Sequence, residues 1–393
     1  MKRINVGLIG SGFVASIHVE ALRKVTGLEV AVLACASPNQ SANFAEQHQI
    51  PMAFTDYREM LKVPEIDVVD VCAPNFLHKQ MILDIAASGK HIICEKPLTG
   101  YFTKTGDREP VGDTVDRQQM FQHVWAEMAE IREAIGRSGV SFMYAENWIY
   151  APPIVKAKRL IKSMPGTTIL SQRAEESHSG SHANYTRTWS LAGGGSLLRL
   201  GSHPVASVIH LKHFDGIIKN NSPIRVKSVI AEVGKFTEIP GVAEEGTGWI
   251  TQGAADVEDW ATATLTFTDG TKAIVVSSDT ILGGVRNIHE IFHSRGVLQC
   301  NMNPSADLMI YTPNPEVIGT EYIAEKVETK GGWQYAAPDE DWIRGYPHEM
   351  QDFMECIACG REPISGLELA CETVETIYAA YLAASSGIRV ELR

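Results

Sequence analysis

Short apolar runs alternate with amphipathic stretches through the first part of the chain. The runs are 3–9, 28–34, 66–72, 91–94 and 140–144, and apolar positions recur every three or four residues across 13–25, 40–47, 57–61, 75–88 and 127–137. Such runs are typical of parallel strands buried on both faces, and the periodic stretches are typical of the helices that connect them. The pattern predicts an α/β fold, with a doubly wound parallel sheet over 1–147.

The polar segment 98–116 interrupts this alternation and follows neither period. Long loops in compact domains are often lids or binding loops, but they can also be surface insertions without structure of their own. The sequence leaves both interpretations of this insertion open.

The pattern changes after residue 147. Alternating polar and apolar residues predict strands over 167–174, 224–233, 259–267, 271–278, 288–293 and 297–301. Thr268-Asp269-Gly270 predicts a hairpin between two of them. We expect helices over 151–163 and from a Ser365–Glu368 capping box to Gly387. Residues 148–393 should therefore form an α+β domain with a large, mostly antiparallel open sheet.

Composition excludes some partners. The 393 residues carry a formal net charge of -12, which argues against the clustered basic surface that non-specific nucleic-acid binding needs. No apolar run could span a bilayer, and the N-terminus lacks a signal-peptide pattern, so we expect a cytoplasmic protein. The seven cysteines are scattered, and Cys356 and Cys359 fit a packed helix better than a metal or redox motif.

A glycine-rich turn follows the first predicted strand. Gly10-Ser11-Gly12-Phe13-Val14-Ala15 fits G-x-G-x-x-[GA] and lies between a strand and a helix, as dinucleotide binding requires. The first glycine permits the turn, the second lets the backbone approach a pyrophosphate, and the helix N-terminus attracts its charge. The motif predicts a nicotinamide dinucleotide held by residues 10–14.

The end of the second strand bears on the choice between NAD and NADP. The stretch Cys35-Ala36-Ser37-Pro38-Asn39-Gln40 has neither a carboxylate for a ribose hydroxyl nor a Lys or Arg for a 2′-phosphate. Ser37 can hydrogen-bond either group. The lack of a cation favours NAD, with NADP left open.

Five segments together resemble the Gfo/Idh/MocA family, named for glucose–fructose oxidoreductase, inositol dehydrogenase and a rhizopine-catabolism protein. They are the glycine-rich turn, Ala73-Pro74-Asn75-Phe76-Leu77-His78, Glu95-Lys96-Pro97, the stretch from Gly193 to His203, and the closing helix 366–386. The resemblance covers nearly the whole chain, and Glu-Lys-Pro after a Rossmann strand is specific.

The resemblance implies hydride transfer between nicotinamide and a ring carbon of a sugar, sugar acid or cyclic polyol. By position, Lys96 would hydrogen-bond the reacting hydroxyl, and His203 would be the acid/base for its proton, which suits a side chain titrating near neutrality. The resemblance also implies a homodimer or homotetramer formed through the C-terminal sheet. The expected cofactor contacts beyond residues 10–14 are Ser37, Ala73, Pro74, Asn75, His78, Glu95, Lys96 and Pro97.

Arg199 departs from the family pattern, which commonly has an aspartate four residues before the histidine. An arginine cannot accept a proton or orient an imidazole as a carboxylate would. It could bind a substrate carboxylate or phosphate, or be structural and leave Lys96 and His203 as the proton machinery. It could also mark a protein that no longer works as a simple dehydrogenase.

A polar stretch precedes the glycine triplet and reads Glu175-Glu176-Ser177-His178-Ser179-Gly180-Ser181-His182. With His203, these residues could bind a divalent metal, contact sugar hydroxyls or form an exposed loop. We expect sugar contacts from His178 and His182 and no metal. Glu146 could face the same cleft. The candidate substrate-binding residues are Lys96, Asn147, His178, His182, Tyr185, Arg199 and His203.

The sequence thus predicts an NAD(P)-dependent dehydrogenase with a small carbohydrate or polyol substrate and no nucleic-acid or membrane partner. One alternative is a hydrolase or lyase that uses tightly held NAD to oxidise a glycoside transiently. Another is a non-catalytic dinucleotide-binding protein, against which the intact Lys96 and His203 count.

Overall fold

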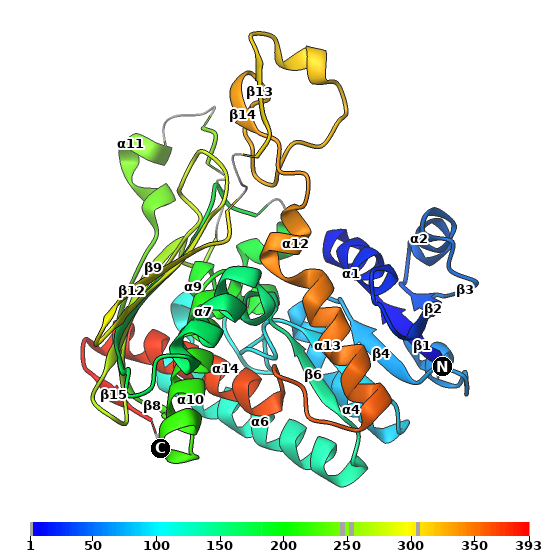
Figure 1. Ribbon diagram of the computed structural model, residues 1–393, viewed down its shortest axis with the longest axis horizontal. Helices are drawn as coiled ribbons and strands as arrows, with labels where there is room; N and C mark the ends of the chain where they lie inside the picture. The colour runs from blue at the N-terminus through cyan, green and yellow to red at the C-terminus, as the bar shows by residue number, and fades with distance from the viewer. Residues whose placement is uncertain (1–2, 182, 244–247, 251–254, 304–306, 393) are drawn as a thin grey trace.

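The computed structural model describes residues 3–181, 183–243, 248–250, 255–303 and 307–392. A parallel sheet flanked by helices occupies one side of the molecule, and a larger open sheet occupies the other (Figure 1). The predicted α/β class, with a mostly antiparallel sheet after the Rossmann half, is confirmed.

Six parallel strands form the first sheet, in the order β3-β2-β1-β4-β5-β6. The strand order reverses between β1 and β4, where open α/β sheets bind ligands at the carboxyl ends of their strands. β3 has only three residues, too few to show a period, so the sequence pattern did not reveal it. The strands are β1 (Arg3–Ile9), β2 (Glu29–Ala36), β3 (Met52–Phe54), β4 (Val68–Val71), β5 (His91–Glu95) and β6 (Phe142–Ala145).

Helices cover this sheet in the predicted places, with one clear difference. The helix expected at 127–137 begins at Arg117, because the Asp116 side chain caps it by accepting the Gln119 N–H. The helices are α1 (Phe13–Arg23), α2 (Ser41–His48), α3 (Tyr57–Leu61), α4 (His78–Ala87) and α6 (Arg117–Ser138). A short helix that was not predicted, α5 (Val111–Thr114), lies in the insertion 98–116.

The insertion 98–116 is an ordered segment that packs against the C-terminal half. The Tyr101 N–H donates to the Tyr378 hydroxyl, and the Gly112 N–H donates to the Asp256 carboxylate. A Cβ on Gly112 would lie 2.0 Å from the Asp256 carbonyl oxygen, so the two backbones touch there. The segment is therefore neither an unstructured surface insertion nor part of the main pocket described below.

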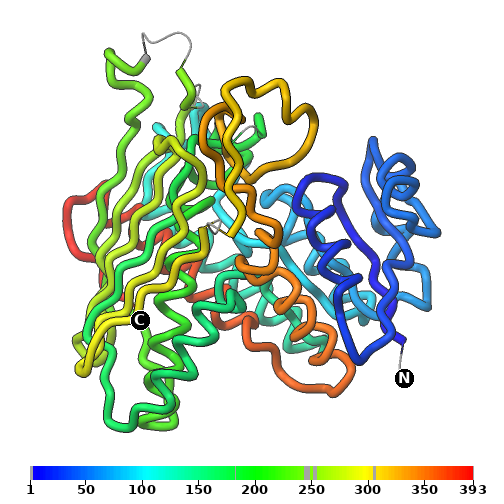
Figure 2. The backbone as a smooth tube through the Cα atoms, turned by 45° about the horizontal axis from the view of Figure 1, so that its top comes forward, coloured from blue at the N-terminus to red at the C-terminus, as the bar shows by residue number. Residues whose placement is uncertain are grey.

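Seven strands form the second sheet, in the order β12-β11-β7-β10-β9-β8-β15. The β7–β10 pair is parallel and the other pairs are antiparallel. This sheet forms the left-hand wall of the molecule in Figure 2. The strands are β7 (Ile169–Ser177), β8 (Val226–Gly234), β9 (Trp260–Phe267), β10 (Lys272–Ser278), β11 (Arg286–His293), β12 (Gly296–Asn301) and β15 (Val390–Glu391).

Two long helices pack on the inner face of this sheet. They are α10 (Ser202–Asn220) and α14 (Leu367–Ser386), and α10 is buried on most sides, so its sequence has little amphipathic period. The other helices of this half are α7 (Pro152–Lys162), α8 (Trp189–Ala192), α9 (Ser196–Arg199), α11 (Pro240–Ala243), α12 (Glu340–Arg344) and α13 (Tyr346–Cys359). A two-stranded hairpin of β13 (Met309–Thr312) and β14 (Gly332–Tyr335) projects from the top of the view in Figure 1.

The predicted capping box of α14 was wrong. Gly366 is the N-cap and makes no side-chain cap, while Glu368 pairs with Arg132 instead. Ser365 cannot turn into the cap, because its carbonyl accepts the Tyr144 N–H and its own N–H donates to the Tyr150 hydroxyl. Among the helices described, none combines the length and hydropathy needed to cross a membrane.

Candidate active site

A pocket of about 1080 Å³ opens at the carboxyl ends of β1, β2, β4 and β5. It exceeds the range of about 300–1,000 Å³ that is common for small-molecule sites. Residues that follow these strands form one wall. The opposite wall comes from the C-terminal half: Ser181, Ala183, Tyr185, Arg199, Tyr322 and residues 324–327.

The glycine-rich turn lines the pocket and fits the pyrophosphate of a dinucleotide. Gly10 has φ +121°, and a Cβ there would lie 2.4 Å from the Cys72 carbonyl oxygen, so the turn needs glycine for two independent reasons. A Cβ on Gly12, by contrast, would meet nothing within 4 Å. Gly12 is the N-cap of α1, so the helix amides begin beside this open space.

The far end of the pocket contains charged residues that the sequence pattern missed. Ser37, a predicted cofactor contact, lines the pocket, and its hydroxyl lies 2.9 Å from that of Ser11. Thr55, Asp56 and Arg58 join it because β3 and α3 lie beside β2. Asp56 also accepts the backbone N–H of Arg58. A carboxylate and a guanidinium therefore lie where the sequence predicted neither.

The predicted nicotinamide end is assembled from the loops after β4 and β5. Its pocket-lining residues are Ala73, Pro74, Asn75, Glu95, Lys96 and Pro97, and the Lys96–Pro97 bond is cis. His78 is not in the wall and is only 1% exposed. Its two ring nitrogens each lie 2.9 Å from a backbone carbonyl oxygen, of Pro97 and of Ala73. His78 therefore ties the two loops together from behind.

Glu95 is held by a buried histidine. Nδ1 of His18 lies 2.9 Å from Asp70, and its Nε2 lies 3.1 Å from Glu95. Burial would lower the pKa of His18, but Cys72 and Asp70 raise it well above its usual value. Each ring nitrogen therefore faces a carboxylate, and Glu95 in turn accepts the Lys96 N–H.

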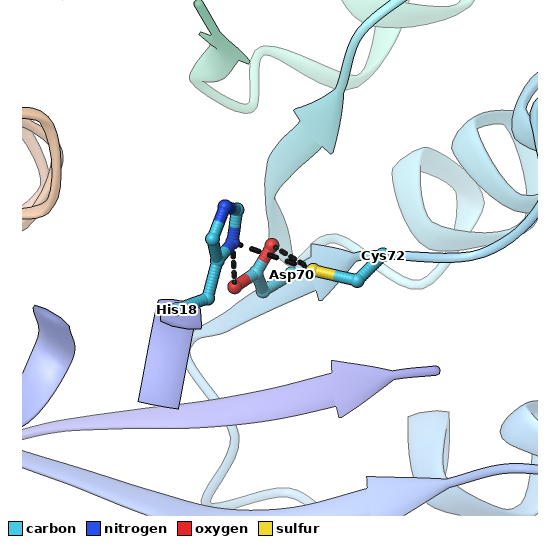
Figure 3. Close-up of side chains that lie close together, drawn as sticks. All are labelled: His18, Asp70 and Cys72. Carbon is cyan, nitrogen blue, oxygen red and sulfur yellow. Dashed lines mark hydrogen bonds and ion pairs between the residues drawn. The ribbon is translucent and has the colours of Figure 1, made fainter. Parts of the chain in front are cut away.

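His18, Asp70 and Cys72 also lie close enough together to be considered as metal ligands (Figure 3). Metal binding needs a free lone pair on the imidazole, and here both ring nitrogens donate to carboxylates. Burial raises the pKa of the Cys72 thiol, which disfavours the thiolate. The donor set fits a charge-paired structural cluster rather than a metal centre.

Lys96 and Arg199 are neighbours on the pocket wall. The Lys96 ammonium donates to the Arg199 carbonyl oxygen over 3.0 Å. The Arg199 guanidinium forms an ion pair with Asp279, which directly follows β10. This pairing favours the structural explanation for Arg199. The partner could not be inferred from the sequence because 80 residues separate the two.

His203 lies in the first turn of α10, is 5% exposed, and is set back from the pocket wall. Its Nδ1 lies 2.6 Å from the Glu146 carboxylate, and Trp148 stacks on its ring at 5.8 Å between centroids. Burial would lower the pKa of His203, but Glu146 and Glu176 raise it. Lys96 lies close enough for its charge to oppose this effect.

The remaining candidates do not all converge. Tyr185 lines the pocket, whereas Asn147 is buried and donates to the Arg344 carbonyl. His178 is also set back: its Nδ1 accepts the Gly180 N–H, and burial with the charges of Arg199 and Lys326 holds its pKa well below the usual range. His182 lies outside the described residues.

Glu175, the first residue of the polar stretch before the glycine triplet, does not face the pocket residues. Glu175 forms an ion pair with Arg286 over 2.9 Å, on the face of β7 away from His203. Glu175 and His178 therefore do not gather into a metal site with His203.

Two family models match the chain. Residues 4–120 match an oxidoreductase family with an NAD-binding Rossmann fold, and residues 154–299 match the GFO/IDH/MocA C-terminal domain. The two matches belong to one family and lie on the two sheets described above.

Similar proteins include an uncharacterised oxidoreductase, YrbE, of Bacillus subtilis (strain 168), which is 24% identical over 75% of this chain and 73% of its own length. Levoglucosan dehydrogenase of Pseudarthrobacter phenanthrenivorans is 30% identical over 52% of this chain and 50% of its own length. The solved structure of GenD2 from gentamicin A biosynthesis, in complex with NAD, has a TM-score of 0.78 and 22% identity, covering 100% of this chain and 97% of that chain.

Proposed function

Because the chain belongs to the GFO/IDH/MocA family of NAD-binding oxidoreductases, we propose that it is a dehydrogenase acting on a ring hydroxyl of a sugar, sugar acid or cyclic polyol. One observation carries the proposal: Lys96 lies on the wall of a pocket whose other end is the glycine-rich turn of a Rossmann sheet. The similarity to levoglucosan dehydrogenase supports a carbohydrate substrate.

The proposed cofactor contacts follow the pocket wall. Residues 10–14 and the N-terminus of α1 would hold the pyrophosphate, and Ser37 would contact the adenosine ribose. Asn75, Glu95 and Pro97 would contact the nicotinamide end, with His78 supporting them. NAD, when bound, supplies the hydride acceptor.

The proposed proton chemistry uses Lys96 and His203. An ammonium group has three donors, and the Arg199 carbonyl takes one of those on Lys96, which leaves two for the substrate hydroxyl. Its charge would stabilise the developing alkoxide. His203 would accept the hydroxyl proton. Tyr185 would pack against the sugar ring from the opposite wall.

We further propose that the protein is a cytoplasmic homodimer or homotetramer that assembles through the outer face of the second sheet. Leu170, Ile230 and Ile274 are 51%, 41% and 40% exposed on strands of that sheet. Apolar surface of this kind is common at subunit interfaces. The mass in solution, measured by light scattering, tests this part, and a monomer at micromolar concentration would remove it.

The test of function is an absorbance screen. Purified protein is given NAD or NADP with a panel of sugars, inositols and uronic acids, and the Lys96→Ala variant is the matched control. We expect one compound to generate the absorbance band of reduced nicotinamide, and the variant to be strongly impaired with that compound. Cleavage of a glycoside without net reduction of the cofactor would overturn the proposal in favour of transient oxidation.

A further inference from the structure

The His203 imidazole lies between two carboxylates that come from different strands. Glu146 follows β6 of the first sheet, and Glu176 lies near the end of β7 in the second sheet. His203 opens α10 and is oriented by both. The two carboxylates have different surroundings, and this difference indicates a separate role for each.

Glu146 faces Nδ1 and is completely buried. Its Oε1 lies 2.6 Å from Nδ1, and its side chain is 0% exposed. An ionised carboxylate is only an acceptor, so Nδ1 must carry a proton and donate it. The proton on Nδ1 is therefore fixed, and Nε2 is the ring atom that remains free to gain or lose a proton.

Glu176 faces Nε2 across a gap. Its Oε2 lies 3.7 Å from Nε2, which is too long for a hydrogen bond. This oxygen is buried and has no hydrogen-bond partner among the residues described. Buried polar atoms normally have a partner, so the orphaned oxygen points to a group that belongs in the gap.

A hydroxyl oxygen fits the geometry of this gap. An oxygen about 2.8 Å from each of two atoms that are 3.7 Å apart is within hydrogen-bond distance of both, and its single O–H can be shared between the two acceptors as a three-centre bond. The side chains of His203 and Glu176 are 7% and 11% exposed, whereas that of Glu146 is 0% exposed. The charge of Lys96 lowers the pKa of both His203 and Glu176.

We propose that Glu176 is a further catalytic residue, which binds the reacting hydroxyl together with Nε2 of His203, and that Glu146 is a positioning residue that keeps the proton on Nδ1. In the direction of oxidation, the hydroxyl O–H bond breaks, its single proton goes to Nε2, and the Glu176 carboxylate stabilises the imidazolium that forms. The NAD of the proposed function accepts the hydride, so the inference rests on that function.

Glu175 provides a matched control beside Glu176. The two residues are adjacent on β7, so their side chains lie on opposite faces of the sheet. Glu175 pairs with Arg286 and also accepts from the Ser177 hydroxyl. Glu175→Gln thus removes one carboxylate from the same strand without touching the imidazole.

The charges around the imidazole set the expected pH behaviour. Glu146 and Glu176 raise the pKa of His203 and Lys96 opposes them, while burial raises the pKa of Glu176. Further titratable groups lie around this cluster: Glu95, Tyr144, Glu325, Arg344 and Glu349. Removing the Glu176 charge should therefore shift the titration of Nε2 to lower pH.

The first measurement is a nitrogen-15 NMR titration of the histidine rings in the whole protein with NAD bound. The His203 signal is assigned by its loss in His203→Gln. We expect Nδ1 to stay protonated across the titration, and Glu176→Gln to move the Nε2 titration to lower pH. Glu175→Gln should leave it in place, and Glu146→Gln should release the Nδ1 proton. An unshifted Nε2 titration in Glu176→Gln overturns the proposal.

The second measurement uses the compound that the absorbance screen identifies. Glu176→Gln should lower kcat by about 100-fold or more and flatten the pH profile, at unchanged melting temperature. Glu146→Asp should recover part of the activity that Glu146→Gln loses. A purely structural role would instead lower the melting temperature and leave the pH profile intact. If no compound reduces NAD, the proposed function fails. The NMR titration still tests whether Glu146 and Glu176 pair with Nδ1 and Nε2 of His203.

Discussion

A methyl group added at Gly10 should act on the fold, whereas one added at Gly12 should act only on the cofactor. In Gly10→Ala the new Cβ meets the Cys72 carbonyl oxygen at 2.4 Å and its carbon at 2.9 Å, both backbone atoms. The position also has φ +121°, which L side chains rarely adopt. In Gly12→Ala the new atom enters open space in the pocket.

The magnitudes follow from these contacts. Strained backbone at a non-glycine residue costs about 1–3 kcal/mol, and overpacking against atoms that cannot move adds about 1–3 kcal/mol. We therefore expect Gly10→Ala to lose at least about 2 kcal/mol of stability, which lowers the melting midpoint of a chain of this length by about 2 °C or more. Gly12→Ala should melt with the parent protein when NAD is absent.

Two assays separate the effects. Thermal unfolding without NAD reports the fold, and isothermal titration with NAD reports the cofactor site. Gly12→Ala should bind NAD at least about 10-fold more weakly, since its methyl group occupies the space proposed for the pyrophosphate. The reasoning is refuted if Gly10→Ala melts like the parent, or if Gly12→Ala binds NAD with the parent's affinity.

Three further predictions concern charged residues. Lys96→Ala should lower kcat by about 100-fold or more in steady-state assays while NAD binding changes little. Arg199→Met should destabilise the protein to urea by about 3–5 kcal/mol because it leaves Asp279 buried and unpaired, and adding Asp279→Asn should restore most of this loss. Burial would raise the pKa of Glu127, but His123 and two lysines lower it to about 2. The stability from this carboxylate is therefore present above its ordinary pKa and is lost as pH falls towards 2, so Glu127→Gln should flatten the acid limb of the stability curve.

The sequence pattern predicted two kinds of strand. The strands β1, β4 and β5 are mainly apolar runs, and the strands of the second sheet alternate apolar and polar residues. It missed β3 because three residues give no measurable period. It also missed α10, because a helix that is buried on most sides has no polar face.

The candidate site was predictable where residues adjoin a motif. Gly10, Ser37 and Lys96 line the pocket because they directly follow parallel strands. Asp279 and Arg58 could not be found in this way, because tertiary packing brings them from other elements.

The roles of the Glu176 and Glu146 side chains could not be predicted from the sequence either. Both lie in segments that the sequence singled out, but only the structure shows that each faces a different nitrogen of His203.

The most direct test of the central claim follows the transferred hydrogen itself. The compound that reduces the cofactor in the absorbance screen is prepared with deuterium on its reacting ring carbon, and the reduced cofactor formed by the enzyme is analysed by mass spectrometry. We predict that the deuterium is recovered on the nicotinamide ring and that Lys96→Ala forms this product far more slowly. Reduced cofactor without deuterium, or equal rates in the two proteins, would contradict the account.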